Sequence, residues 1–250
     1  MELKENERID DLQFKNLKII QNEKAFCFGI DAVLLSDFAK KISSKSTVVD
    51  FCTGTGIVAI LLAGKTNCQK IYAVEVQESM AEMAKRSVEL NGQENVIEVI
   101  NDDLNNIEKY IKPASVNVVT VNPPYKKKGS GIINELDTKT IARHEVLCSL
   151  EDIVKKASKI LNFGGSFFMV HRVERLVDVL SVMRANKLEP KRIRFVHPSA
   201  GKAPNLFLVE GVKCGKPFLK VEEPLYVYDE NGRYTCNILE IYGMNAKSKE

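Results

Sequence analysis

Residues 47–64, T-V-V-D-F-C-T-G-T-G-I-V-A-I-L-L-A-G, decide the fold of this chain. A β-branched run ends at Asp50 and Phe51, a turn with glycines follows, and an apolar helical pattern begins after Gly56. Strand, glycine turn and helix in this order predict the first part of a βαβ unit. Glycines at such a turn allow the backbone to approach a ligand closely, with the helix N-terminus behind them.

The same alternation of strand-like and helical patterns continues along the chain. K-I-Y-A-V-E-V precedes S-M-A-E-M-A-K-R-S-V-E-L-N-G, which ends on the helix stop Asn91-Gly92, and the strand-like runs N-V-I-E-V-I and V-N-V-V-T-V follow. A helix near residues 150–161 leads into S-F-F-M-V-H-R. Strands that alternate with helices predict an α/β fold, with a Rossmann-like, mainly parallel sheet and helices on both faces.

Both ends of the chain depart from this alternation. I-R-F-V-H-P and N-L-F-L-V-E-G-V have little helix between them, and Asn231-Gly232 separates two further strand-like runs as in a hairpin. The sheet is therefore expected to finish with antiparallel strands. Residues 1–46 are expected to form a cap, a hairpin plus a helix with Asp31 at its N-cap, packed on a domain of residues 47–250.

Composition limits the function classes. With 44% hydrophobic and 28% charged residues the chain is an ordinary globular protein, and its net charge of only +3 means that a polyanion must be bound by local clusters. The cysteines lack CxxC spacing and no histidine joins them, so we expect reduced thiols and no metal site. A polar N-terminus and apolar runs far shorter than the about 20 residues of a membrane span predict a cytoplasmic protein, which we expect to be a monomer.

The glycine turn itself is a candidate cofactor site. The pattern D-x-C-x-G-x-G places an acid before the glycines, which suits a cationic ligand such as S-adenosylmethionine better than a pyrophosphate. Ala59 stands where the dinucleotide fingerprint has its third glycine. NAD, FAD and a purely structural turn are the alternatives. The turn residues expected to contact the cofactor are Asp50, Cys52, Gly54 and Gly56.

Acidic residues at the ends of the next two strands could complete this site. Glu75 ends the second strand, where its carboxylate could accept hydrogen bonds from both ribose hydroxyls or could simply be solvated. Asp102 and Asp103 follow the third strand, and one of them could accept the amino group of the cofactor's adenine. Asp103 is favoured because Leu104 after it would pack on the adenine ring, although a helix N-cap role is equally compatible.

The motif Asn122-Pro123-Pro124-Tyr125 directly follows V-N-V-V-T-V, at the carboxyl end of a strand, where open α/β sheets bind their ligands. An aromatic amine is a poor nucleophile because its lone pair is delocalised. The Asn122 side-chain oxygen and the Pro123 carbonyl could each accept one N–H, and so aim the lone pair at a methyl group. The prolines would stiffen these acceptors, and Tyr125 would offer a face for a planar substrate.

Basic residues follow this motif and recur further along the chain. Lys126, Lys127 and Lys128 precede Gly-Ser-Gly, so this loop could hold phosphates while a base is flipped out, or could be only a solvated loop. Arg143 could also reach the substrate or order the loop. The candidates in the later basic stretch, for which a plain surface role is equally possible, are Lys191, Arg192 and Arg194.

The chain resembles the bacterial adenine-N6 methyltransferases that act on the anticodon loop of a valine tRNA, within the seven-stranded, S-adenosylmethionine-dependent class I enzymes. Beside the two motifs, the resemblance covers F-C-F-G-I-D-A-V-L-L, I-A-R-H-E-V, L-N-F-G-G-S-F-F-M-V-H-R, K-R-I-R-F-V-H-P and Y-T-C-N-I-L-E-I-Y. It implies methylation of the adenine 3′ of the anticodon, with Asn122 and Tyr125 in catalysis and base binding. It also implies that Asn122 and the turn ending at Asp31 contact the cofactor.

Other functions remain open on the residues alone. A protein glutamine methyltransferase would use the same motif, but such enzymes usually carry a helical substrate domain for which residues 1–46 are too short. A DNA adenine methyltransferase would need a target-recognition domain. A methyltransferase fold that binds RNA without catalysis would be expected to lose the cofactor acids or Asn122-Pro123-Pro124-Tyr125, and both are present.

Overall fold

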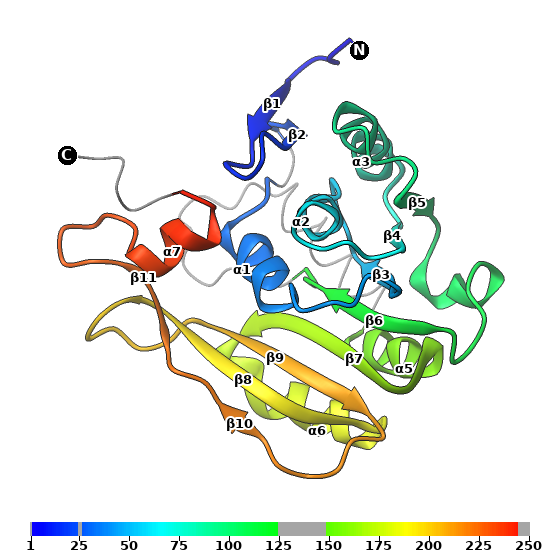
Figure 1. Ribbon diagram of the computed structural model, residues 1–250, viewed down its shortest axis with the longest axis vertical. Coiled ribbons are helices and arrows are strands. Elements are labelled where there is room, and N and C mark those ends of the chain that lie inside the picture. Colours follow the sequence, from blue (N-terminus) through cyan, green and yellow to red (C-terminus); the bar gives the residue numbers. More distant parts are fainter. Residues whose placement is uncertain (1, 25–26, 125–148, 245–250) are drawn as a thin grey trace.

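The computed structural model describes residues 2–24, 27–124 and 149–244, and it contains one large mixed sheet covered by helices (Figure 1). The order across this nine-stranded sheet is β10-β8-β9-β7-β6-β3-β4-β5, and β11 also pairs with β8. The strands are β3 (Thr47–Phe51), β4 (Lys70–Glu75), β5 (Ile97–Asn101), β6 (Val116–Val121), β7 (Leu161–Arg172), β8 (Leu188–Ser199), β9 (Leu206–Lys213), β10 (Lys220–Val221) and β11 (Leu225–Tyr228).

This architecture confirms the predicted α/β fold with a mainly parallel sheet. Strands β3 to β9 are the seven expected strands, and the short β10 and β11 are added at the outer edge. Among the described strands of the sheet, β9 alone runs against the others, because it is antiparallel to both β7 and β8. The strands that end along the same side of the sheet therefore include β3, β6, β7, β8 and β11. We call this line of strand ends the carboxyl edge of the sheet.

Side chains of the central strands alternate between two hydrophobic cores, one on each face of the sheet. Val48 and Val118 belong to the first core, whereas Val49 and Val119 belong to the second. The first core is covered by α1 (Ile30–Phe38), α2 (Ile57–Lys65) and α3 (Glu78–Leu90), and the second by η1 (Leu104–Lys109), α5 (Leu150–Ile160) and α6 (Leu176–Ala185). Strands buried on both faces explain the continuous apolar runs in the sequence.

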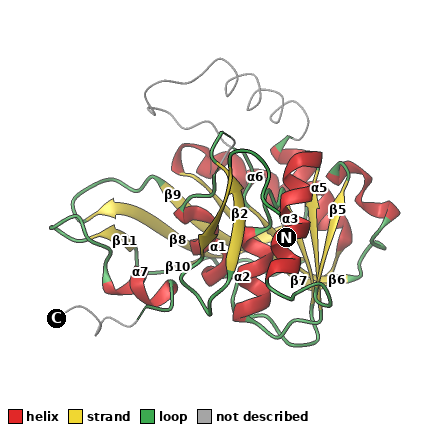
Figure 2. Ribbon diagram, turned by 90° about the horizontal axis from the view of Figure 1, so that it is seen from above, coloured by secondary structure: helices red, strands yellow, loops and turns green. Residues whose placement is uncertain are grey.

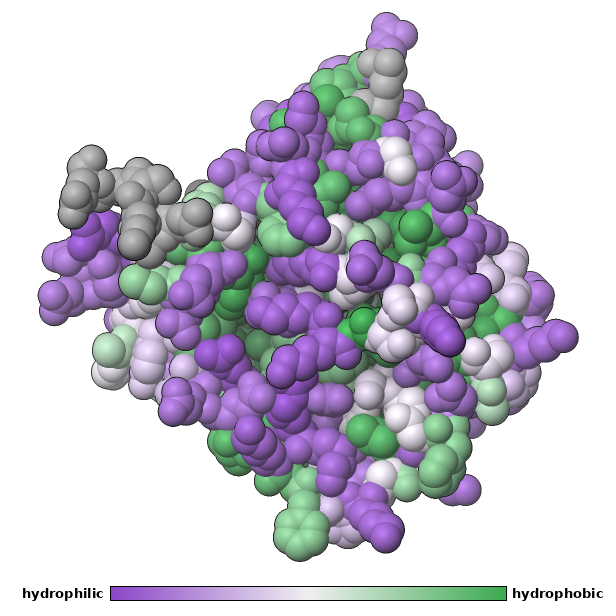
Figure 3. All heavy atoms as spheres, in the orientation of Figure 1, coloured by the Kyte–Doolittle hydropathy of each residue, from purple (hydrophilic) through white to green (hydrophobic). Residues whose placement is uncertain are grey.

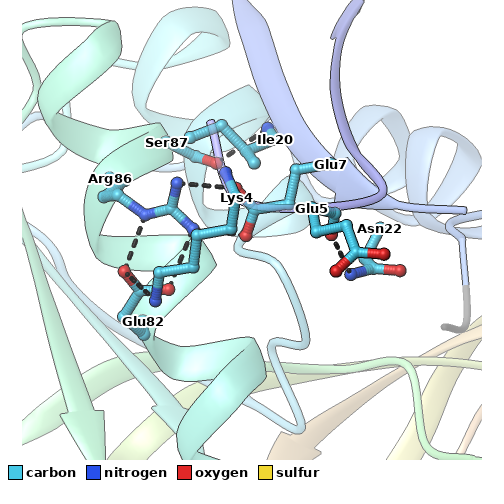
Figure 4. Close-up of polar contacts among 8 residues, drawn as sticks. All are labelled: Lys4, Glu5, Glu7, Ile20, Asn22, Glu82, Arg86 and Ser87. Atoms are coloured by element: carbon cyan, nitrogen blue, oxygen red, sulfur yellow. Dashed lines mark hydrogen bonds and ion pairs between the residues drawn. The ribbon is translucent and has the colours of Figure 1, made fainter. Parts of the chain in front are cut away.

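The N-terminal residues form an antiparallel hairpin of β1 (Glu7–Asp11) and β2 (Lys18–Asn22), which packs on α3. Ile20 is fully buried against Met80 and Met83, and its backbone N–H donates to Ser87 Oγ at 2.9 Å. Arg86 joins the two elements through an ion pair with Glu7 at 2.6 Å (Figure 4). The division at residue 46 stays a prediction.

Two local predictions are wrong in detail, and one helix was not predicted. Helix α1 has its N-cap at Gly29, so Asp31 lies in the first turn, where its Oδ1 accepts from Ala32 N at 3.0 Å. Little helix was expected between β8 and β9, and none forms there. The helix that was not predicted is α6, between β7 and β8, whose Val179 and Met183, one turn apart, are fully buried.

The second wrong prediction concerns the C-terminal hairpin. The turn at Asn231-Gly232 follows β11, but only the bridge Tyr228–Tyr234 forms, and helix α7 (Cys236–Ile241) replaces the expected second arm. Its Ile238 and Ile241 are buried at helical spacing. Polar residues cover most of the face seen in Figure 3, with apolar ones in scattered patches. In the described part of the chain no helix is long and apolar enough to cross a bilayer.

The Arg86–Glu7 contact allows a test of how the hairpin is held. The side chains of Arg86 and Glu7 are 13% and 4% exposed, so Arg86→Met would leave a carboxylate without its cation in a nearly dry site. We expect the free energy of unfolding, measured in urea, to fall by about 2–3 kcal/mol. The control is Lys70→Met, which removes the more exposed Lys70–Glu98 pair and should cost less than about 1 kcal/mol. Equal losses in the two variants would contradict this view of the hairpin.

Candidate active site

The predicted cofactor and catalytic residues meet at the carboxyl ends of β3, β4 and β6. Adjacent strands are parallel here, with Asp50 beside Ala73 on one side and beside Thr120 on the other. Glu75 ends β4, and Asn122 directly follows β6. Residues that are far apart in the sequence are thus collected at one edge, as is usual for ligand sites in open α/β sheets.

Asp50 is the most buried acid of this group, with only 1% of its surface exposed. Its Oδ1 accepts a hydrogen bond from Thr120 Oγ1 at 2.6 Å, and its Oδ2 accepts one from Thr53 Oγ1 at 2.5 Å. Burial raises the pKa of Asp50 to about 7, the two hydroxyls oppose this shift, and the nearby Glu75 adds to it. The carboxylate therefore joins β3, the glycine turn and β6 in one contact.

The glycine turn is shaped for close approach of a ligand. Cys52, Gly54 and Gly56 have φ values of 55°, 57° and 90°, in the left-handed region that favours glycine. A side chain at Gly56 would lie 3.3 Å from the Cβ of Ala84, so the third helix packs directly behind the turn. Gly54 faces open space, because a Cβ there would have no heavy atom within 4 Å.

Glu75 is 6% exposed and is oriented by the backbone around it. Its Oε2 accepts from Gly54 N at 2.9 Å, and its Oε1 accepts from Gln77 N at 3.0 Å. Asn101 donates to the carbonyl oxygens of Glu75 and Val76 and so fixes the end of β4. In the described residues no cationic side chain pairs with Asp50 or Glu75. Two buried carboxylates without a cation make a site that suits a positively charged ligand.

The two acids after β5 have different local roles. Asp102 accepts hydrogen bonds from Asp103 N, Asn106 Nδ2 and Tyr110 Oη, and these donors lower its pKa to about 2, with Asn106 the largest cause. Asp103 is the N-cap of η1, where its Oδ1 accepts from Asn105 N at 2.8 Å. Asp102 accepts three hydrogen bonds within the fold and Asp103 accepts one, which leaves Asp103 the better candidate for a ligand.

Asn122 carries the clearest sign of a missing partner. Its side-chain oxygen is buried, yet it has no hydrogen-bond partner among the described residues. A buried amide oxygen without a donor is costly. In the described part of the chain Arg86 Nε and Gln93 Oε1 are buried without a hydrogen-bond partner as well, but Asn122 Oδ1 is the one that lies at the carboxyl end of a central strand, beside the cofactor candidates. Pro123 is buried beside it and Pro124 is exposed. The predicted residues Tyr125, Lys126, Lys127, Lys128 and Arg143 lie outside the described residues.

The later basic residues are not equivalent. Arg192 donates to Glu210, Glu222 and the Phe38 carbonyl, and its guanidinium lies 4.0 Å from the centroid of the Phe38 ring. This geometry favours a structural role for Arg192, because its contacts join β8 to β9, to α1 and to the residue after β10. Lys191 and Arg194 contact backbone carbonyls of the loops around β10 and are partly exposed.

Two residues of this site were missed in the sequence, namely Thr53 and Thr120. Both donate to Asp50, and Thr120 is buried in the strand that leads to Asn122. Their signal was weak because threonine is an ordinary residue in a β-branched strand or a turn. Only the register of β3 against β6 shows that the Thr120 hydroxyl reaches the acid.

Comparisons with known proteins agree with this geometry. The methyltransferase small domain family matches residues 16–185. A tRNA1(Val) (adenine(37)-N6)-methyltransferase of Histophilus somni is 29% identical, covering 90% of this chain and 92% of its own length. The enzyme of the same name from Porphyromonas gingivalis is 26% identical over 80% of both chains.

Solved structures show the same fold at lower identity. A predicted O-methyltransferase from Agrobacterium tumefaciens aligns with a TM-score of 0.67 at 21% identity, covering 85% of this chain and 95% of that one. TYW2 of M. jannaschii, solved in complex with AdoMet, aligns with a TM-score of 0.57 at 15% identity, covering 85% and 87%. From the match over residues 16–185, together with this site, the chain belongs to the methyltransferase small domain family.

Proposed function

We propose that this protein transfers a methyl group from S-adenosylmethionine to the exocyclic N6 amino group of an adenine in tRNA. The buried side-chain oxygen of Asn122, which has no donor among the described residues, is the single observation that carries the reaction type. It lies at the carboxyl end of β6, next to the strand that bears Asp50. The relatives that match along most of the chain are named for methylation of adenine 37 of tRNA1(Val), which makes that base the first candidate.

The residues present fit the proposed cofactor. When bound, S-adenosylmethionine would supply an electrophilic methyl group on a positively charged sulfur. Glu75 would accept hydrogen bonds from the ribose hydroxyls, and Asp103 would accept the adenine amino group. The open space above Gly54 allows the backbone to approach the ligand. Asp31, which is buried in the first turn of α1, and Cys52 in the glycine turn would complete the lining.

The catalytic role of the motif is to prepare the amine. Asn122 Oδ1 and the Pro123 carbonyl would accept the two N–H groups of the adenine amine, which directs the nitrogen lone pair toward the methyl group. The amine would take the methyl group that S-adenosylmethionine supplies, and the extra proton of the methylated amine would then leave to water. Pro123 and Pro124 restrict the backbone, so the acceptors keep their positions without the substrate. Tyr125 would stack on the adenine.

An RNA substrate is favoured over a glutamine side chain by the basic loop after the motif. Lys126, Lys127 and Lys128 would bind phosphates beside the flipped base, with Arg143 as a further contact. Lys191 and Arg194 are secondary candidates for RNA contact. Arg192 is a weaker one, because its guanidinium already donates to Glu210 and to the Phe38 carbonyl. A tRNA substrate implies a cytoplasmic enzyme, and we expect it to act as a monomer.

The reaction is tested by incubating the protein with methyl-labelled S-adenosylmethionine and tRNA from a strain that lacks the gene. We expect label in N6-methyladenosine, and fragment mapping should place it 3′ of the anticodon. Label in glutamine of a protein, with tRNA unlabelled, would replace this proposal with the glutamine methyltransferase.

Asn122→Ala removes one of the two acceptors. Because that acceptor acts on the reacting amine, kcat should fall roughly 100-fold or more. Binding of S-adenosylmethionine, measured by calorimetry, should change less than about 3-fold, since the cofactor acids remain. Asn95→Ala, at an exposed asparagine before β5, is the control and should retain full activity. Near-normal turnover in Asn122→Ala would remove the proposed role.

Asp50 predicts a pH dependence of cofactor binding. The pKa of Asp50 in the free protein is raised to about 7, and a bound cation would lower it by favouring the carboxylate. Affinity should thus be full above the free-state pKa and should decline as the pH falls below about 7, with proton release on binding. Calorimetry at several pH values in buffers of different ionisation enthalpy measures both. Asp50→Asn should release no proton; if it releases as many as the wild type, another group is responsible.

The run of lysines after the motif, Lys126 to Lys128, which we call the lysine loop, predicts that tRNA affinity depends on salt concentration. Changing Lys126, Lys127 and Lys128 together to alanine should weaken tRNA binding and reduce the slope of log affinity against log salt by about 2, as for loss of three contacts to single-stranded phosphates. Changing the exposed Lys41 and Lys45, which precede β3 at the opposite edge of the sheet, should leave the slope nearly unchanged. The loop has no such role if both variants have the wild-type slope.

A further inference from the structure

Three exposed tyrosines gather at the outer end of the sheet, away from the residues used above. Tyr226 and Tyr228 project from the same side of β11, and Tyr234 follows the next turn. Their exposed fractions are 37%, 41% and 38%, so each side chain is held by the fold and still presents part of its surface to solvent. We call these three residues the tyrosine surface.

The rings are ordered rather than scattered. Tyr228 and Tyr234 are stacked with centroids 5.4 Å apart and planes 15° apart, and Tyr234 stacks in turn on Tyr242 at 5.8 Å and 18°. Tyr226 lies against the His197 ring at 5.2 Å. The row runs from exposed Tyr228 to half-buried Tyr242, whose pKa is raised by burial and by its tyrosine neighbours, with Asp31 a smaller cause. The row therefore runs from the solvent-exposed Tyr228 into the first hydrophobic core, against which Tyr242 packs.

A hollow of about 640 Å³ lies beside these rings, within the usual range of about 300–1,000 Å³ for ligand sites. Tyr226, Tyr228 and Thr235 line it from one side, and Ala200 and Lys202 from the loop after β8. It is open to solvent, so it suits one or two planar groups of a larger molecule better than an enclosed small ligand.

The tyrosine surface lies at the same edge of the sheet as Asn122. Strand β11 is parallel to β8, and β8 is parallel in turn to β7 and β6 because β9 reverses the direction twice. Four strand spacings separate β11 from β6, which is roughly 20 Å. Figure 2 shows β11 and the end of β8 together at one end of the molecule. An RNA loop that presents its target base to Asn122 can span this distance with neighbouring nucleotides.

Charge at the hollow favours bases over phosphates. Asp229 and Glu230 line it together with Lys202, and Asp229 is already bonded to the backbone of Asn231 and Arg233 and to the Arg233 side chain. Asp229 and Glu230 are thus balanced by Lys202 and Arg233, and the surface offers little attraction to a phosphate chain. Exposed aromatic faces, by contrast, stack on any unpaired base.

We propose that the tyrosine surface binds unpaired bases of the substrate RNA that flank the methylated adenine. This rests on the proposed function, because it takes the same RNA at the same edge of the sheet. Tyr228 would extend its stacked row by one nucleobase, and Tyr226 would hold a second. The lysine loop supplies the attraction to phosphates, and the tyrosines fix which part of the RNA loop lies over the site.

The test uses a stem-loop with the anticodon loop of valine tRNA, in which 2-aminopurine replaces each unpaired base in turn, with S-adenosylhomocysteine present to prevent turnover. Stacking on tyrosine quenches 2-aminopurine, so wild-type protein should quench it at one or two positions. Tyr228→Ala should abolish quenching at one of them and weaken RNA binding at least about 5-fold, the lower end for one stacked base. Tyr228→Phe should behave like the wild type, since the ring is retained.

Matched variants separate stacking from damage to the fold. Tyr226→Ala should remove quenching at a different position, and Phe163→Ala, an 84% exposed ring near the start of β7 at the opposite edge, should change nothing. Affinity for S-adenosylhomocysteine and thermal stability should stay at wild-type values in all four variants. Loss of both together with RNA binding would show that the tyrosines only support the fold, and would overturn the proposal.

The result also separates this proposal from the proposed function. If the wild type forms N6-methyladenosine while Tyr228→Ala and Tyr226→Ala bind and quench like the wild type, the tyrosine surface is not used and the reaction stands. If both variants lose quenching while the wild type methylates no adenine, the tyrosine surface does bind RNA bases, but adenine N6 methylation is not the reaction.

Discussion

The contact on which the site depends is the buried carboxylate of Asp50 between two threonine hydroxyls. Thr120 lies on β6 and Thr53 in the glycine turn, so one acid fixes the catalytic strand and the cofactor turn relative to each other. Because Asn122 is two residues beyond Thr120, its position follows from the same register. The acid is 1% exposed, and hydroxyl donors only partly replace the water that it has lost.

This arrangement is poorly suited to stability alone. Burial, with a smaller contribution from the neighbouring Glu75, raises the pKa of Asp50 to about 7, so above that pH two negative charges are buried near each other. A fold selected only for stability would place a cation there or replace the acid with an apolar residue. A site that must accept a positively charged ligand has to leave that position open, and the ligand then stabilises the folded state by binding it. The side-chain oxygen of Asn122, which has no donor within residues 2–24, 27–124 and 149–244, would follow the same logic for the proposed substrate amine.

The sequence was sufficient for the fold class and for placing the candidate site residues at the ends of neighbouring strands, since both depend on local patterns. The glycine turn, Glu75 at the end of β4, Asp103 after β5 and Asn122 after β6 could be located from periodicity and motif alone. Contacts that depend on strand register could not be located in this way. Thr120 donates to Asp50, and Arg192, which the sequence suggested as a surface charge, packs on Phe38. Helix α7 was also missed, because the burial of Ile238 and Ile241 outweighs a strong hairpin turn.

The reversed strand β9 explains why RNA could be held along one edge of the protein. A sheet that ended at β7 would present only the cofactor and the catalytic motif at its carboxyl edge. Because β9 is antiparallel, β8 returns in the direction of β6, extends to Ser199 and carries β11 with it. The one reversed strand thus places the stacked tyrosines and Asn122 at the same edge, separated by strands rather than by the thickness of the sheet. A substrate that is longer than one base can then be bound at both places without any second domain.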